Sequence, residues 1–256
     1  MISMNIAESQ IIAHPFLWPF MFAVLLYGLR FILFASLVYL FAHPKRSGGL
    51  GRPHADVPAV FNNTLHVKRE LINTMLTVLI FGLVNAALFG FGFVNASALY
   101  RSISAYPLWW FWLSIPLMLV LHDSFFYWLH RAMHTQLLFA AMHRTHHLSV
   151  YPTTFAAYSF HPTEALAEAL IVTAIIFIMP VHPIAFLIFQ TISTAYNVYG
   201  HCGREFYPEN WANHRLGKWL NSSTLHAYHH LKGRGNYGFY FTFWDRIMGT
   251  IEPSKK

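Results

Sequence analysis

The chain has little charge: Asp, Glu, Lys and Arg make up only 11% of its 256 residues, whereas soluble domains contain about a quarter. Hydrophobic residues make up 55% of the chain, and the mean hydropathy is +0.40. This composition argues against a soluble domain and predicts an integral membrane protein. Aromatic residues, at 18%, fit either interfacial belts of Trp and Tyr or a lipid-binding groove, and composition does not separate these two uses.

Cysteine is almost absent. The single Cys202 excludes an intrachain disulfide and a metal site of four thiolates, so any bound metal must be held by nitrogen or oxygen. Low-complexity linkers, internal repeats and long charged tails are also missing, which favours one integrated domain.

Long apolar runs are present at 16–42, at 71–93 and from 108 into a histidine-rich region near His122. Two further runs, 165–179 and 184–193, are too short for a full span and are separated by two prolines, which predicts a tight helical hairpin. The first run lacks the basic start and the cleavage site of a signal peptide. We therefore expect an all-α integral membrane helical bundle of about four to five membrane helices.

The distribution of basic residues predicts the topology. Segment 43–70 contains five Lys and Arg residues, whereas the 94–107 connection contains only Arg101. By the positive-inside rule the first loop is cytoplasmic, and the 129–164 segment and the 200–256 tail follow on the same side. The net charge of +7 is spread over membrane loops without a nucleic-acid-binding motif, so it predicts contact with anionic lipid and no nucleic-acid partner.

Three compact histidine boxes carry the chemistry: HRAMH at 130–134, HRTHH at 143–147 and HAYHH at 226–230. Residues four apart lie on one face of a helix. Imidazole suits zinc, copper, iron and nickel, and eight imidazoles exceed the about four to six ligands that one ion accepts. The boxes therefore predict two metal ions. A structural zinc site needs only about four ligands, which disfavours structural zinc. No acid lies within the boxes, so the ligands should be nearly all neutral.

Together with Asn236-Tyr237-Gly238, Trp244-Asp245 and Gly249-Thr250, these boxes resemble the sterol desaturase and fatty acid hydroxylase superfamily of membrane histidine-box di-iron oxygenases. HPTE at 161–164 and GHCGRE at 200–205 also stand at the expected places. The resemblance covers about half of the chain, from 123 to 250, and residues 1–120 match only in being hydrophobic. It divides the chain into N-terminal transmembrane helices, 1–120, and a histidine-box catalytic region, 121–256, within a single integrated domain.

The resemblance implies two iron ions in a cytoplasmic histidine-rich helical cap, with zinc able to replace iron during purification. The ligands that it implies are His130, His134, His143, His146, His147, His201, His226, His229 and His230. It also makes Asn197 a candidate for holding a metal-bound water. Further candidates for orienting the ligands are His161, His122, Asp123 and Glu164; the two acids could instead pair with Arg131 or Arg144.

The activity implied is hydroxylation or desaturation of a sterol, fatty acyl or related lipid, a choice that the sequence leaves open. Dioxygen is the co-substrate, and the electrons come from a separate donor such as cytochrome b5, a ferredoxin or a reductase. Two alternatives remain at this stage. A carotenoid hydroxylase has similar boxes, and a non-enzymatic membrane metal-binding or transport protein would also concentrate histidines, although it would place them inside its spans.

Overall fold

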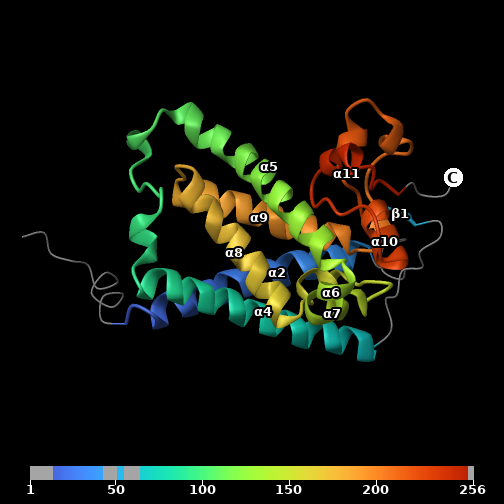
Figure 1. The fold of residues 1–256 in the computed structure, drawn as a ribbon, viewed down its shortest axis with the longest axis horizontal. Coiled ribbons are helices and arrows are strands. Elements are labelled where there is room, and N and C mark those ends of the chain that lie inside the picture. The colour runs from blue at the N-terminus through green and yellow to red at the C-terminus, as the bar shows by residue number, and fades with distance from the viewer. Residues whose placement is uncertain (1–13, 43–50, 55–63, 253–256) are drawn as a thin grey trace, which may run out of the picture.

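The computed structural model describes residues 14–42, 51–54 and 64–252. Most of the expected cytoplasmic loop, 43–70, lies outside these ranges. Within them, five long helices run along the molecule, and shorter elements gather at one end (Figure 1). The long helices are α2 (Leu17–Ala42), α4 (Thr64–Gly90), α5 (Leu108–Met133), α8 (Pro162–Ile178) and α9 (Pro183–Gly200). The expected all-α membrane fold is confirmed.

Three of these helices are long and apolar enough to cross a membrane, namely α2, α4 and α5. Each has 26 or 27 residues, or about 39 Å at 1.5 Å per residue, which exceeds the roughly 30 Å of a hydrocarbon core. Helix α4 begins at Thr64, before the apolar run expected at 71–93, and ends at Gly90. Helix α5 runs without a break into the first histidine box.

Helices α8 and α9 are joined by the short turn expected at 180–183, but they pack mainly against α5, α4 and α2 and hardly against each other, so the expected tight hairpin does not form. They have 17 and 18 residues, or about 26 Å each, which is shorter than a full span. The chain becomes extended at Met179, and His182 caps α9 by accepting a hydrogen bond from the backbone N–H of Ile184. Pro183 then occupies the first turn, where a missing N–H costs nothing.

The hydrophobic core consists of two clusters. One joins α2, α4 and α8 around Phe31, Phe81 and Tyr158, and the other joins α5, α8 and α9 around Met118 and Phe189. The outer faces of the long helices remain strongly apolar, as expected for surfaces that contact lipid acyl chains. The long helices therefore share a buried hydrophobic core, while their outer faces expose large apolar side chains.

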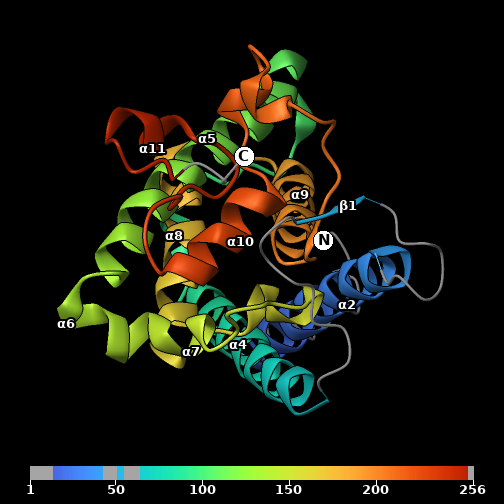
Figure 2. The ribbon, with the colours of Figure 1, turned by 90° about the vertical axis from the view of Figure 1, so that its right-hand side faces the viewer.

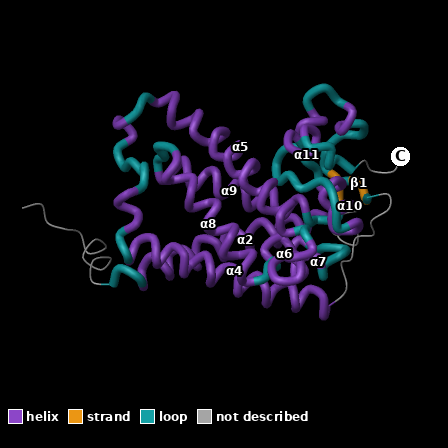
Figure 3. The backbone as a smooth tube through the Cα atoms, viewed as in Figure 1, coloured by secondary structure: helices purple, strands orange, loops and turns teal. Residues whose placement is uncertain are grey.

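The shorter elements lie together at the end where α2, α5 and α9 finish (Figures 1 and 2). They are α6 (Gln136–Leu138), the π-helical η3 (Phe139–His143), α7 (Arg144–His147), α10 (Ser223–Lys232), α11 (Phe243–Ile247) and the 3-10 turns η4 (Thr154–Tyr158), η5 (Trp211–Asn213) and η6 (Gly217–Trp219). Two other 3-10 turns, η1 (Phe93–Ala96) and η2 (Ile103–Ala105), join α4 to α5 at the opposite end (Figure 3). All three histidine boxes belong to the first group or to the last turn of α5.

A short antiparallel pair ties the chain after α2 to this end. Strand β1 (Arg52–Pro53) pairs with β2 (Arg204–Glu205). The Arg204 Nη1 donates to the Gly51 carbonyl at 2.8 Å, and Arg52 Nη2 donates to the Tyr207 carbonyl at 2.7 Å. These contacts hold the end of α9, and with it His201, in a fixed position.

Candidate metal centre

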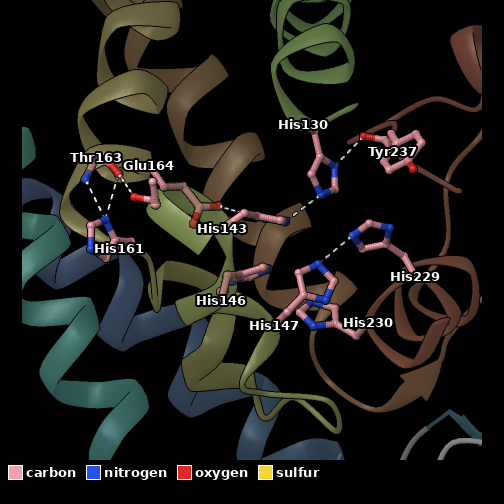
Figure 4. Close-up of polar contacts among 12 residues, drawn as sticks. His130, His143, His146, His147, His161, Thr163, Glu164, His229, His230 and Tyr237 are labelled. Carbon is pink, nitrogen blue, oxygen red and sulfur yellow. Dashed lines mark hydrogen bonds and ion pairs between the residues drawn. The ribbon is translucent and has the colours of Figure 1, made fainter. Parts of the chain in front are cut away.

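Nine histidines converge in two adjacent clusters at the end of the bundle. Figure 4 labels His130, His143, His146, His147, His229 and His230 from these clusters. Within each cluster the candidate ligand atoms lie within 4.8 Å of one another. The first cluster contains His130, His134, His143, His147 and His229, and the second contains His146, His201, His226 and His230. These are the same nine residues that the resemblance implied, and the structure brings all of them together. Their role as ligands is taken up below as a proposal.

Helical geometry explains how two similar boxes serve both clusters. In α10, His226 and His230 are four residues apart and share a face, so both reach the second cluster, while His229 projects about 100° away into the first. The HRTHH box divides the other way, because His143 and His147 reach the first cluster and His146 reaches the second. The repeated HxxHH spacing therefore builds two neighbouring sites.

Backbone carbonyls determine which ring nitrogen carries the proton. The Nδ1–H groups of four histidines donate to carbonyl oxygens at 2.7 to 3.0 Å. The pairs are His130 with Tyr237, His134 with Gly233, His201 with Asn197 and His229 with Gly235. Because a carbonyl oxygen only accepts, Nδ1 holds the proton in each neutral ring and Nε2 is left with a bare lone pair.

The Nε2 atoms nevertheless lie very close to one another. His130 and His143 approach to 3.0 Å, His147 and His229 to 3.0 Å, and His201 and His226 to 2.9 Å. The Nε2 of His134 is buried and has no hydrogen-bond partner among the described residues. With metal–nitrogen bonds of about 2.1 Å, ligands at a right angle would be about 3.0 Å apart and tetrahedral ligands about 3.4 Å apart. The donor atoms thus fit one metal ion in each cluster.

Burial keeps the imidazoles in the form that binds metal. It lowers the pKa of His229 to about 3 and the pKa values of His134 and His201 to about 4. Desolvation of the charged ring is the main cause, and the neighbouring imidazoles lower the pKa of His229 further. Neutral rings are therefore available throughout the physiological range, as metal coordination requires.

Glu164 supports the first cluster from outside. It lies in the first turn of α8, is fully buried, and its Oε1 is 2.6 Å from His143 Nδ1 (Figure 4). A carboxylate in this position accepts the Nδ1 proton and leaves Nε2 free to bind a metal. Of the two uses considered for Glu164, acceptance of a ligand proton is the one that the structure displays, and no pairing with Arg131 or Arg144 is seen among the described residues.

Asp123 has a different role from either one expected. It neither contacts a cluster histidine nor pairs with Arg131 or Arg144. Instead, its Oδ1 accepts hydrogen bonds from the backbone N–H groups of residues 239, 240 and 241 at 2.6 to 3.1 Å. Neither expected contact forms among the described residues, because Oδ1 of this carboxyl group faces a loop distant in sequence. Asp123 therefore anchors the C-terminal segment 233–250, called the cap below, to α5.

The three remaining candidates lie outside both clusters. His161 caps α8 through Thr163 and points away from the centre (Figure 4). His122 is buried among aromatic rings two turns before His130. The Asn197 side chain donates to the Ala157 carbonyl at 2.7 Å, and its own carbonyl accepts from His201. A water held by Asn197 stays a prediction.

Sequence reasoning missed the carbonyl groups of the cap. Gly233, Gly235 and Tyr237 orient three cluster histidines through backbone atoms, which no side-chain pattern reveals. The sequence signal that could have indicated them is the run of turn residues Gly233, Gly235 and Asn236. In the structure these residues adopt positive φ angles of 66°, 67° and 52°. This backbone geometry suits glycine and asparagine. These turn residues thus contribute directly to the site through their backbone carbonyl groups.

A cavity opens beside the clusters toward the bundle. Its lining includes the cluster histidines His143, His146 and His201 and the rings of Phe126, Phe160 and Phe239, together with polar side chains such as Tyr196 and Asn221. Imidazole and hydrocarbon groups therefore border the same space. An apolar molecule that entered it would contact the clusters directly.

Comparison with known proteins agrees with this geometry. The fatty acid hydroxylase family model matches residues 115–250, just over half of the chain. Lathosterol oxidases from Mus musculus and Homo sapiens are each 30% identical over 188 residues, covering 73% of this chain and 61% of theirs. A probable Delta(7)-sterol 5(6)-desaturase from Neurospora crassa is 28% identical over 236 residues, covering 89% of this chain and 62% of its own.

The chain thus spans about three fifths of the length of these curated relatives. No solved structure is significantly similar to it. The matched region includes all nine clustered histidines, Glu164 and the cap that holds them. On this evidence the chain belongs to the fatty acid hydroxylase family, within the superfamily that also contains the sterol desaturases.

Proposed function

We propose that this protein is a membrane di-iron oxidoreductase that hydroxylates or desaturates a lipid with dioxygen and externally supplied electrons. The observation that carries the proposal is the convergence of histidine Nε2 atoms in two clusters, with separations of 2.9 to 3.3 Å. In the His130–His143 pair both Nδ1 protons are held by oxygen acceptors, so two bare Nε2 lone pairs face each other at 3.0 Å. Such lone pairs repel each other unless a cation lies between them. Membership of the family adds that the lipid class is that of sterols and fatty acyl chains.

The protein's own residues would prepare the site in three ways. Carbonyl groups of the cap and the Glu164 carboxyl group hold the histidine rings in one orientation. Buried side chains exclude bulk water, and Phe126, Phe160 and Phe239 guide an apolar substrate to the clusters. Two ions held there would supply the oxidising power that breaks an unactivated C–H bond after dioxygen binds.

The position of the clusters favours this function over transport. They lie at or beyond the ends of the long helices, with only His130 inside a candidate span. A transporter would place its polar groups near the middle of the membrane. The basic segment 43–70 further supports a cytoplasmic location for the clusters, where a soluble or membrane-bound reductase or cytochrome could deliver electrons.

Metal analysis and lipid analysis together test the proposal. Protein expressed with added iron should contain close to two transition-metal ions per chain, and membranes from expressing cells should contain an oxidised lipid detectable by mass spectrometry. H146A and H229A should abolish that product, whereas H214A should retain it, because His214 lies outside both clusters and stacks on Trp211. Wild-type protein with one ion or none, or product formation by H146A and H229A with metal still bound, would disprove the proposal.

A further inference from the structure

A second cavity lies next to the first, farther into the bundle. The two share the side chains of Phe126, Phe160, Asn197 and Phe239. Unlike an ordinary hydrophobic core, the second cavity has several polar side chains in its wall. They include Tyr27, His122, Glu168, Gln190 and Ser193, contributed by α2, α5, α8 and α9.

Two of these polar side chains are buried with hydrogen-bonding capacity left unused. His122 is 3% exposed and its Nδ1 has no hydrogen-bond partner among the described residues. Glu168 is 7% exposed and forms no ion pair within the described ranges. Leaving such a group unpaired costs about 1–3 kcal/mol or more. Ionisable residues within membrane helices usually mark a site that binds something. Both side chains line the same cavity, which places that site between them.

The wall chemistry selects an uncharged hydroxyl group. Imidazole and carboxamide groups donate and accept hydrogen bonds, and the Glu168 oxygens accept them. No Lys or Arg from the described ranges lines the cavity; Arg30 lies against the ring of Tyr27, 4.7 Å from its centroid, and is not part of the wall. A carboxylate or phosphate would therefore find no cation in this wall, whereas a hydroxyl group can donate to Glu168 and accept from His122.

We propose that the second cavity binds the hydroxyl group of an uncharged lipid alcohol, with His122 and Glu168 as its hydrogen-bonding partners. This inference rests on the proposed function, since the lipid skeleton would extend past Phe126, Phe160 and Phe239 to the metal centre. The two ends of the substrate would then be fixed by different parts of the protein. His122 and Glu168 are specificity-determining residues in this arrangement.

The helices set the distance between the hydroxyl group and the oxidised carbon. His122 precedes His130 by eight residues on α5, and Glu168 follows Glu164 by four residues on α8. These separations correspond to about 12 Å and about 6 Å along the helix axes. In this arrangement the oxidised carbon would lie several bonds from the carbon that bears the hydroxyl group.

Equilibrium binding to the full-length, metal-free protein in lipid nanodiscs tests the inference. The probes are lathosterol and octadecan-1-ol, each compared with its methyl ether, with stearate as the anionic competitor. In wild-type protein at least one alcohol should bind at least about tenfold more tightly than its ether, because the ether leaves a buried partner unpaired. E168L and H122F should reduce this ratio to below about threefold, and E168Q should retain most of it, because an amide oxygen still accepts.

Val172→Ala provides the matched control. Val172 lines the same cavity but has no polar atom, so V172A should preserve the preference for the alcohol even if both affinities change. Equal binding of alcohol and ether by the wild type, no binding of either alcohol, or tighter binding of stearate would each overturn the inference. If E168L does not fold, H122F decides. Because binding is measured without metal, a failure to oxidise lipid would count against the proposed function and not against this site.

Discussion

Glu164 allows the two clusters to be tested separately. Its carboxyl group contacts His143, which belongs only to the first cluster. In E164A the hydrogen bond to Nδ1 is lost, and with it the fixed tautomer and orientation of that ring. A hydrogen bond to a charged partner contributes about 1.5–3 kcal/mol, or roughly a tenfold to hundredfold change in affinity. Loss of a carboxylate behind a metal-bound histidine has a similar effect, about 10- to 100-fold.

The assay is a competition titration with a graded series of chelators, followed by elemental analysis. Wild-type protein should release two ions per chain. In E164A one ion should be released at a chelator strength about 10- to 100-fold lower, and the other should be unchanged, since the carboxyl group of Glu164 contacts no histidine of the second cluster. E164Q should lie between wild type and E164A, because its amide oxygen still accepts a hydrogen bond while its charge is lost.

His161→Ala serves as the control for this experiment. His161 caps the same helix only three residues before Glu164, yet it has no contact with either cluster. Its loss should weaken α8 slightly and leave both metal affinities unchanged. An equal decrease for both ions in E164A, or no decrease at all, would show that Glu164 does not act through His143.

Three other predictions concern the same site. H229A and H226A should each lower metal content from about two ions to about one, and the ion that remains should differ between the two variants, because these residues belong to different clusters. In metal-free protein, thermal stability should decrease as the pH falls from 6.5 toward about 4. The pKa values of His134 and His201 are about 4 in the folded state and near 6.5 in the unfolded chain. The unfolded chain therefore binds more protons in this pH range, which favours unfolding. Stability that is independent of pH there would contradict the buried neutral rings. D123A should lower the melting temperature, because three backbone N–H groups lose their acceptor at about 1 kcal/mol or more each. It should also weaken metal binding in the first cluster, because the displaced segment includes the Tyr237 carbonyl that accepts from His130. Normal stability and metal content in D123A would refute this prediction.

Much of the fold and of the site could be read from the sequence, because both depend on short-range patterns. The apolar runs predicted the spans of α2, α4 and α5, and the break at Pro180 to Pro183 predicted the turn between α8 and α9. The three boxes identified eight of the nine clustered histidines, because HxxHH places its side chains on adjacent faces of one helix turn wherever that helix lies. The ninth, His201, needed the resemblance, since a single histidine at the end of a helix has no local pattern.

The division of the histidines between two clusters was decided only by tertiary structure. It depends on how the ends of α5, α7, α9 and α10 meet, and sequence spacing contains no information about those distances. The same holds for Asp123, whose three partners lie about 120 residues away along the chain, and for the cap carbonyls that set the ring tautomers. Backbone acceptors look identical in every sequence, so only the folded chain shows which of them face a histidine. The amino-acid sequence thus determined the ligand chemistry, and the packing of the helix ends determined how that chemistry is shared between two sites.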